Sequence, residues 1–435
     1  MSLGKDSNSN NLMEKVISLA KRRGFIYPGS EIYGGLAGFY DFGPLGTELK
    51  FNIKQSWWRD TVQLRDDVVG LSAAIIMNPK VWEASGHLSG GFVDKLIECK
   101  KCHQRFKADD FKGICPNCKG KEFTEPRQFN TMFRTFVGPA EDTTSVTYLR
   151  PETAGGIFVN FKNVLDTMRV KIPFGIAQIG KAFRNEINPK EFVFRTREFE
   201  QMELEYFVRP GEDKKYFEKW VEQRFDWYKS IGLKNIRQRE QAKEERAHYS
   251  KATTDIEYKF PFDWQEIEGI ANRGDFDLKA HMKFSGEDLS CFDEESKEKI
   301  APYVIEPSAG VERILLALLC EAYYEDKDRV VLKLNSKLAP YKIAVFPLLA
   351  NKPKLVELAR KIYSDLKKDF VVAWDDRGNI GKRYYSQDEI GTPYCITVDF
   401  ESLEKNDVTV RDRDTTKQVR VNIGELKNYF NERFK

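Results

Sequence analysis

The stretch RTREFEQMELEYF, residues 195–207, decides the fold, because charged and apolar side chains alternate along it. Residues two apart on a strand share one face of a sheet. Met202, Leu204 and Tyr206 would therefore face a core. The opposite face would carry Arg195, Arg197, Phe199, Gln201, Glu203 and Glu205. The pattern predicts a strand with an apolar back and a polar front.

The preceding segment, IAQIGKAFRNE at 176–186, divides in the same way, with Gln178, Gly180, Arg184 and Glu186 on one face. The link between the two strands, INPKEFVF, contains an Asn-Pro pair typical of a turn. We therefore predict an antiparallel hairpin whose polar face forms one floor. On such a floor an Arg can grip a phosphate, an aromatic ring can stack on a base, and a carboxylate can accept from an amine. A surface sheet with cross-strand ion pairs would give the same alternation, so the hairpin alone leaves both interpretations open.

A second segment, VIEPSAGVER at 304–313, favours the nucleotide interpretation. It reads as a strand with Glu306 and Ser308 on one face, a turn at Gly310 and the start of an apolar helix. Arg313 falls in the first turn of that helix, where the dipole favours anions. An Arg there is well placed to meet a phosphate, although an ion pair with a nearby Glu is the simpler alternative.

Gross composition limits the class of protein. The chain has 435 residues, enough for two to four domains, with 41% hydrophobic and 31% charged residues. It contains no apolar run of 18 residues and no apolar signal core, which predicts a cytoplasmic protein without a membrane partner. A net charge of only +3 means that any nucleic acid would have to be held by local patches.

The domain organisation follows from shifts in pattern along the chain. We expect a flexible tail at 1–11, a core formed by 12–91 and 127–325, a Cys-rich insertion at 92–126, a linker at 326–340, and a mixed α/β domain at 341–435. Within the core we expect helices at 12–24 and 45–64, a buried strand at 68–79, a charged helical region at 211–250, and strands over 254–284.

Four of the seven cysteines form one array, Cys99-x2-Cys102 and Cys115-x2-Cys118. Two such knuckles can bring four thiolates to one tetrahedral Zn²⁺ with no open ligand position, so the predicted metal is structural. Four reduced thiols without a metal are the alternative.

Two stretches of the last domain carry candidate RNA contacts. KRYYSQDE, residues 382–389, interleaves cations with aromatic rings, which suits the stacking of unpaired bases. Arg411 and Arg413 share one face of a predicted strand. A solvated charged strand explains the arginine pair equally well.

Taken together, these segments resemble the three signature motifs of the class II aminoacyl-tRNA synthetases. The helix at 45–64 with the segment ending at Pro79 resembles motif 1, the FRNE hairpin resembles motif 2, and GVER at 310–313 resembles motif 3. Within that class the sequence is most similar to the glycyl-tRNA synthetases, in stretches such as RRGFIYPGSEIYGG, LRPETAGGIF, GIANRGDFDL and DDRGNIGKRYY.

The resemblance implies an α+β fold: an antiparallel sheet flanked by helices, a zinc-ribbon-like insertion and a C-terminal anticodon-binding domain. It also implies a homodimer through motif 1, and ATP-dependent ligation of glycine to tRNA(Gly) through a glycyl-adenylate. ATP would bind with Mg²⁺.

Residue roles carried over by position place Arg184 on the α-phosphate and Arg313 near the γ-phosphate, as the two catalytic residues. The ATP site would comprise Arg184, Asn185, Glu186, Phe194, Arg195, Thr196, Arg197, Glu198, Phe199, Glu266, Ile267, Gly310, Val311, Glu312 and Arg313. The glycine site would comprise Arg105, Glu152, Phe199, Glu200, Gln201, Met202, Glu203, Arg273, Glu306, Pro307, Ser308, Ala309 and Gly310. Glu152, Glu203 and Glu306 would attract the ammonium group, Ser308 would fill space, and Arg273 would steer the carboxylate.

Two other readings remain open. A synthetase-like accessory protein could bind structured nucleic acid without catalysis, although it would be free to lose Arg184, Glu186 or Arg313. A synthetase for another small amino acid would need room that three carboxylates deny. The sequence also departs from the family at Gly155, where Gln is usual, at Gly274, where Thr is usual, and in a motif 2 loop without Gly after its Pro.

Overall fold

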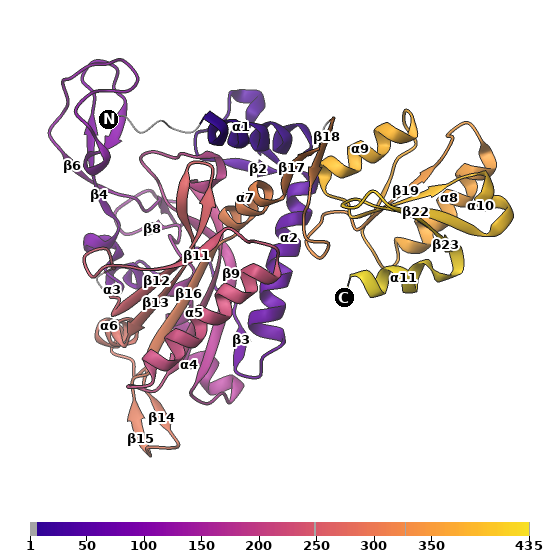
Figure 1. Ribbon diagram of the computed structural model, residues 1–435. Helices are drawn as coiled ribbons and strands as arrows, with labels where there is room; N and C mark the ends of the chain where they lie inside the picture. The colour runs from indigo at the N-terminus through magenta and orange to yellow at the C-terminus, as the bar shows by residue number, and fades with distance from the viewer. Residues whose placement is uncertain (1–6, 248, 327, 435) are drawn as a thin grey trace.

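The computed structural model describes residues 7–247, 249–326 and 328–434 (Figure 1). Its centre is a seven-stranded sheet in the order β11-β12-β13-β16-β10-β9-β3. The strands are β3 (Val68–Gly70), β9 (Phe174–Phe183), β10 (Glu198–Val208), β11 (Ile236–Glu240), β12 (Ala252–Phe260), β13 (Asp263–Gly274) and β16 (Tyr303–Gly310). All neighbouring strands run antiparallel except β3 and β9, which are parallel.

Helices cover both faces of this sheet (Figure 1). They are α1 (Ser7–Arg22), α2 (Pro44–Trp58), α3 (Lys80–Ala84), α4 (Ala154–Met168), α5 (Asp213–Ser230), α6 (Phe276–Ser285) and α7 (Val311–Ala322). The larger core joins α1, α2, α5 and α7 to one face, and a smaller core joins α4 and α6 to the other. No described helix is both long enough and apolar enough to cross a membrane.

The alternation in β10 gives the sheet its two faces, as predicted. Met202, Leu204 and Tyr206 are buried in the larger core. On the opposite face, Phe207 packs in the smaller core, whereas Gln201 and Glu203 lie further along the same strand. One end of this face is therefore apolar, and the other end carries the polar floor.

Several element boundaries differ from those expected. Helix α1 already begins at Ser7, inside the expected tail, while residues 1–6 lie outside the described part. The strand expected at 68–79 is wrong beyond Gly70, because the chain then becomes irregular with Ile75 and Ile76 exposed. The helical region expected at 211–250 is wrong after Ser230, since β11 follows and pairs with β12.

Residues 93–130 form a separate module, the Cys module, at the upper left of Figure 1. Its three-stranded sheet has the order β5-β4-β6, with β4 (Val93–Glu98), β5 (Arg105–Lys107) and β6 (Arg127–Asn130). The last strand lies just beyond the expected boundary at 126. Short hairpins elsewhere pair β1 (Ile26–Pro28) with β2 (Tyr40–Phe42), β7 (Arg134–Phe136) with β8 (Val146–Tyr148), and β14 (Cys291–Asp293) with β15 (Glu298–Ile300).

The C-terminal domain is a five-stranded sheet in the order β20-β19-β21-β22-β23, on the right of Figure 1. Its strands are β19 (Ile343–Pro347), β20 (Val372–Trp374), β21 (Tyr394–Val398), β22 (Asp407–Asp412) and β23 (Gln418–Asn422). Its helices are α8 (Pro353–Leu366), α9 (Ile380–Ile390), α10 (Phe400–Lys405) and α11 (Leu426–Arg433).

The segment expected as a linker is structured. Strand β18 (Arg329–Leu332) pairs with β17 (Tyr323–Asp326), and Leu334 and Leu338 are buried in the larger core. The described residues of this segment, 326 and 328–340, therefore pack between the two domains rather than spanning a gap.

Candidate active site

The predicted hairpin exists, and its register sets the floor. In β9 and β10, Glu203 lies opposite Gln178 and Phe199 opposite Ala182. On the other side, Glu203 lies opposite Ser308 of β16. These strands and the start of α7 enclose one pocket, lined by Arg184, Glu186, Val193, Phe194, Arg195, Thr196, Phe199, Gln201, Glu266, Ser308, Gly310, Glu312 and Arg313.

The two predicted catalytic arginines face this pocket from opposite sides, each held by main-chain oxygen atoms. Arg184 donates from Nε to the Pro151 carbonyl at 3.0 Å. Arg313 donates from Nη1 to the Glu266 carbonyl at 3.0 Å, and its guanidinium carbon lies 4.5 Å from the Phe194 ring centre. The carbonyl partner of Arg184 does not neutralise its charge, which suits binding of a polyphosphate. Arg313 also forms a partly exposed ion pair with Glu266 Oε1 at 3.3 Å, the alternative that its place in the sequence left open.

Some predicted ATP residues do not line the pocket. Arg197 donates to the carbonyls of Glu186 and Ala37, and Glu198 pairs with Lys181. Ile267 and Val311 belong to the larger core, and the backbone of Asn185 donates to the Thr131 carbonyl at 2.6 Å. Arg197 and Asn185 thus hold the loop between β9 and β10 in place. The side chains of Glu198, Ile267 and Val311 lie outside the pocket.

Glu312 lines the pocket but is already engaged. Its carboxylate accepts from Lys50 Nζ at 2.5 Å and from the backbone N–H of Glu200 at 2.9 Å. Lys50 comes from α2 and also pairs with Glu200 at 2.8 Å. The buried Lys50 therefore ties α2 and α7 to β10, a role that the helical pattern alone could not signal.

Three carboxylates meet beside the pocket, as predicted. Glu152, Glu203 and Glu306 are 8%, 2% and 6% exposed. Glu203 accepts from the backbone N–H of Thr153 at 2.8 Å and from its hydroxyl at 2.5 Å. It also accepts from Gln201 Nε2 at 2.8 Å and from the Ser308 hydroxyl at 2.6 Å. Glu203 thus organises the cavity floor.

Arg273 is paired with two carboxylates. It is 2% exposed and donates to both oxygens of Asp277 at 2.7 Å and to Glu306 at 2.8 Å. Three of the five guanidinium N–H groups are thereby used, and the expectation that Arg273 steers the substrate carboxylate stays a prediction. In this structure the side chain orients Glu306.

Burial and mutual repulsion shift the pKa values of these acids. Burial and the nearby carboxylates raise the pKa of Glu306 to about 8, against the lowering effect of Arg273. Burial and Glu152 also raise the pKa of Glu203. Burial opposes ionisation of Glu152, but His87, Arg273 and Arg184 lower its pKa to about 2. At neutral pH the cavity therefore holds at least one firm negative charge.

The other predicted glycine-site residues divide by strand parity. Glu200, Met202, Pro307 and Ala309 alternate with the floor residues, so their side chains point to the other face, and Met202 and Ala309 lie in the larger core. Arg105 stands on β5 of the Cys module, 61% exposed, and pairs with Glu98. In this structure Arg105 does not line the pocket.

The sequence gives no site role to Thr153, Gln178, Phe92 and Glu205. Of the four histidines, His87 in EASGH is the one that the sequence places nearest the site, although a structural role is the favoured interpretation there. Gln178 accepts from the backbone N–H of Ala73 and donates to the Thr153 carbonyl at 2.9 Å, beneath Glu203. Glu205 is fully buried, and among the described residues neither of its oxygens has a hydrogen-bond partner. Its position on the predicted floor was the available signal.

At two of the three departures from the family, Gly155 and Gly274, an added side chain would meet a close neighbour. Gly155 lies in α4, where an added Cβ would come within 3.0 Å of the Trp82 ring. Gly274 has φ of +59°, which side chains rarely adopt, and an added Cβ would meet Lys251 at 2.8 Å.

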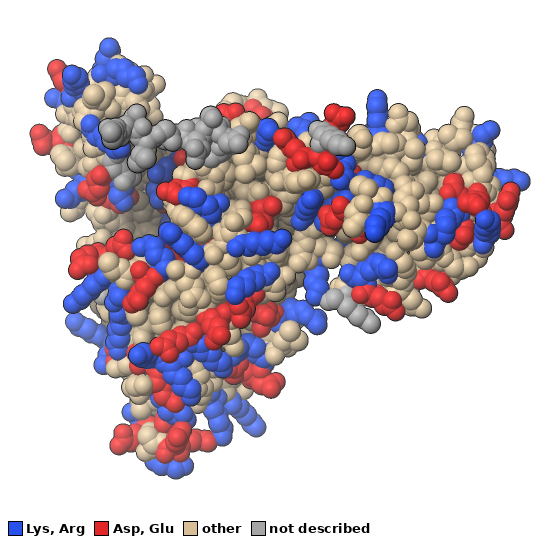
Figure 2. All heavy atoms as spheres, in the orientation of Figure 1, with Lys and Arg blue, Asp and Glu red and all other residues tan. Residues whose placement is uncertain are grey.

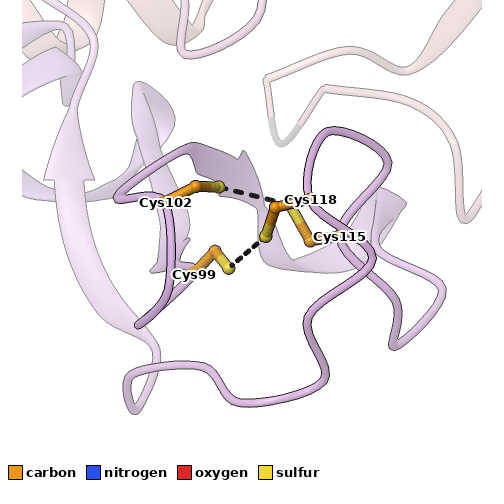
Figure 3. A group of neighbouring side chains, drawn as sticks. All are labelled: Cys99, Cys102, Cys115 and Cys118. Carbon is orange, nitrogen blue, oxygen red and sulfur yellow. Dashed lines mark hydrogen bonds between the residues drawn. The ribbon is translucent and has the colours of Figure 1, made fainter.

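The four cysteines converge as their spacing predicts (Figure 3). All four Sγ atoms lie within 4.8 Å of one another, with Cys99 and Cys118 at 3.6 Å and Cys102 and Cys115 at 3.5 Å. Zn–S bonds of about 2.3 Å in a tetrahedron place sulfur atoms at such separations. Cys99 and Cys115 are fully buried beneath Ile97 and Phe106.

The predicted RNA contacts of the last domain are only partly available. Arg411 donates to Asp388 at 2.9 and 3.0 Å, and Arg413 donates to the carbonyls of Gly391 and Leu334. Both arginines are buried, which excludes a solvated strand and leaves them structural. In KRYYSQDE, Arg383 is also buried, whereas Tyr385 is 50% exposed. On the face shown in Figure 2 both charges are interspersed, with Lys and Arg gathered on the Cys module at the upper left.

Comparison with known proteins agrees with this architecture. Residues 137–322 match the model of the tRNA synthetase class II core domain (G, H, P, S and T), and residues 342–433 match that of the anticodon binding domain. The fold and site therefore define a class II aminoacyl-tRNA synthetase with an α+β core.

Relatives named glycine–tRNA ligase cover nearly the whole chain. Those from Geobacillus kaustophilus and Alkaliphilus oremlandii are 54% and 53% identical over 457 and 459 residues. In each case the match covers 97% of this chain and 98% of the relative. The chain belongs to the glycine–tRNA ligase family.

Proposed function

We propose that this enzyme attaches glycine to tRNA(Gly) in the cytoplasm, through a glycyl-adenylate formed on the floor of β9, β10 and β16. The observation that carries the proposal is one pocket flanked by Arg184 and Arg313 and adjoining three buried carboxylates. ATP with its Mg²⁺ is the substrate of the first step. In-line attack of the glycine carboxylate on the α-phosphorus releases pyrophosphate, and a terminal hydroxyl of the tRNA then takes the glycyl group.

The proposed roles follow the position of each side chain. Arg184 contacts the α-phosphate and Arg313 the γ-phosphate, while Phe199 stacks on the adenine and Glu186 accepts from its amine. No side-chain nucleophile is required, because binding both substrates in line supplies most of the rate.

Selection of glycine would rest on charge and on lack of space. Glu152 and Glu306 face the ammonium group, and the network of Glu203, Gln201 and Ser308 closes the volume where a side chain would lie. Rejecting one methyl group by fit alone is worth about 1–3 kcal/mol, and overpacking of a rigid wall adds to it.

The direct test is glycine-dependent exchange of pyrophosphate into ATP, with alanine and serine as competing substrates. We expect exchange with glycine alone and its loss in Arg184→Ala. An accessory protein that merely binds nucleic acid would show no exchange with any amino acid.

We further propose a structural Zn²⁺ held by Cys99, Cys102, Cys115 and Cys118. Four converging thiols in a small module with little apolar core fit that ion, and four thiolate ligands leave no position for a substrate.

Finally, we propose a homodimer formed around α2 and the segment that follows it. Exposed apolar side chains lie along this part of the chain, at Phe51, Leu64 and Ile76. Light scattering should give a molar mass twice that of one chain. In the double variant Phe51→Glu with Ile76→Glu, the measured mass should fall toward that of a single chain.

A further inference from the structure

A buried relay runs from Ser85 through His87 to Glu152. The Ser85 hydroxyl lies 2.7 Å from His87 Nδ1, and His87 Nε2 lies 3.3 Å from Glu152 Oε2. These residues are 6%, 5% and 8% exposed, respectively. Neither Ser85 nor His87 has a role in the reaction as proposed above.

The His87 ring is fixed on several sides. It stacks on Phe92 with ring centres 4.5 Å apart and meets the edge of Trp82 at 5.3 Å. The His87 carbonyl accepts from Asn130 Nδ2 at 3.1 Å, so the backbone is held as well. A ring packed in this way cannot turn its Nε2 away from Glu152.

The ring nitrogen facing Glu152 must carry a proton, because a lone pair at this distance would repel the carboxylate. Ser85 allows this in either charge state of the ring, since its hydroxyl can donate to Nδ1 or accept from it. The second option leaves the hydroxyl proton for the Val81 carbonyl at 3.0 Å. Among the described residues Nε2 makes no well-aligned hydrogen bond, so its 3.3 Å approach to Glu152 Oε2 is an ion-pair contact.

Glu152 depends on this contact more than its neighbours depend on theirs. Glu203 has hydrogen bonds from Thr153, Gln201 and Ser308, and Glu306 has Arg273. Within the described part of the chain, His87 is the sole ion-pair partner of Glu152.

We propose that His87 is a positioning residue, whose Nε2–H, held by Ser85 and Phe92, fixes the Glu152 carboxylate in the orientation that receives the ammonium group of glycine. The inference rests on the proposed function, because it assigns the Glu152 cavity to glycine. It gives the relay a role in amino-acid binding and none in ATP binding.

The experiment compares His87→Leu with His87→Gln in glycine-dependent ATP–pyrophosphate exchange. Gln keeps an N–H donor at the position of Nε2, whereas Leu fills similar space without one. Losing a polar contact to a buried charged group predicts a rise of about tenfold in KM for glycine with Leu, and a change below about twofold in KM for ATP. His87→Gln should recover most of the glycine affinity.

His281→Leu is the matched control, because His281 is an equally buried histidine, 5% exposed, without an ion pair to Glu152. It should not alter the two KM values selectively. Equal rises in both KM values for His87→Leu, or no recovery with Gln, would overturn the proposal.

If His87→Leu fails to fold, Ser85→Ala decides: a selective rise in KM for glycine supports the relay, and any other result contradicts it. Wild-type protein without glycine-dependent exchange would refute the proposed function instead, so the two failures are distinguishable.

Discussion

The guanidinium carbon of Arg184 lies 5.2 Å from the ring centre of Phe92, the residue that immediately precedes the first strand of the Cys module. At the other end of the module, Thr131 donates its backbone N–H to the Phe92 carbonyl at 2.9 Å and accepts from Asn185 at 2.6 Å. Both ends of the module therefore touch the segment that carries Arg184. The root of the module thus packs against the segment that supplies Arg184 to the proposed ATP site.

Phe92→Leu should weaken the binding of both substrates, because Phe92 contacts Arg184 on one side and His87 on the other. A partly buried cation–π contact is worth about 1 kcal/mol, which predicts a rise of roughly fivefold in KM for ATP. Phe92→Tyr keeps the ring and should stay close to wild type. Exchange assays at varied ATP concentration measure the effect. An unchanged KM for ATP in Phe92→Leu would show that the module does not contribute to ATP binding.

Removing the metal should affect the module first. We expect one Zn²⁺ per chain by elemental analysis and a marked loss in Cys102→Ser, with protease cleavage appearing within 93–130. KM for ATP should then rise, because the module root supports Arg184. Cys320→Ser is the control, since Cys320 is buried in α7 away from the array and should retain full zinc. Wild-type zinc content in Cys102→Ser would argue against a four-thiolate site.

The hairpin and the β16–α7 turn could be predicted because local pattern and tertiary role agree there. A period of two fixes which side chains share the floor, and Gly310 with Arg313 marks a strand-to-helix turn. The same rule shows why the contiguous list from Phe199 to Glu203 is too generous: Glu200 and Met202 necessarily point away from the floor.

The strand β11 could not be predicted, because RQREQAKEERAH has the composition of a helix. This segment is a strand because it pairs with β12. There Glu257 accepts hydrogen bonds from Arg237 and Arg239, and Asp255 accepts one from Arg239. These partners lie some twenty residues away in sequence, beyond the reach of a local pattern. Likewise, the packing of His87 between Trp82 and Phe92 depends on the chain folding back at the root of the module.

Glycine binding near pH 7 should release protons. Burial and neighbouring carboxylates raise the pKa of Glu306 to about 8, so much of it is protonated in the free enzyme, and an arriving ammonium group favours the ionised form. KM for glycine should accordingly fall as pH rises from about 6 to 8. Calorimetry in two buffers of different ionisation enthalpy measures the released fraction, and identical apparent enthalpies in both would contradict it.

The same shift has a consequence for stability. A carboxyl whose pKa is raised on folding binds more protons in the folded state than in the unfolded state, so its contribution to stability falls as pH rises from about 4.5 to about 8. In Glu306→Gln the urea midpoint should depend less on pH across that window.

Arg224 of α5 and Glu268 of β13 form an ion pair that is almost fully removed from solvent, with exposures of 1% and 0% and an N–O distance of 2.8 Å. Arg224→Leu leaves the carboxylate buried without its cation and should lower the free energy of unfolding by about 3–5 kcal/mol. Arg224→Leu with Glu268→Leu should be more stable than the single variant. Lys171→Ala removes an exposed pair with Glu294 and should have no measurable effect in the same urea titration.

Asp388 should decide how well the two domains act together on tRNA. It lies in α9 with no exposed surface and accepts from Arg329 of β18 and from Arg411 of β22. Asp388→Ala would leave two buried arginines without their shared anion and loosen the C-terminal domain from the β17–β18 hairpin. The pocket around Arg184 lies in the other domain, so ATP–pyrophosphate exchange should stay near wild type, while KM for tRNA in aminoacylation rises by about tenfold or more.

Glu401→Ala, an exposed acid of the same domain, should change neither reaction. A parallel loss of exchange and aminoacylation in Asp388→Ala would mean that this cluster stabilises the whole chain rather than the placement of its C-terminal domain.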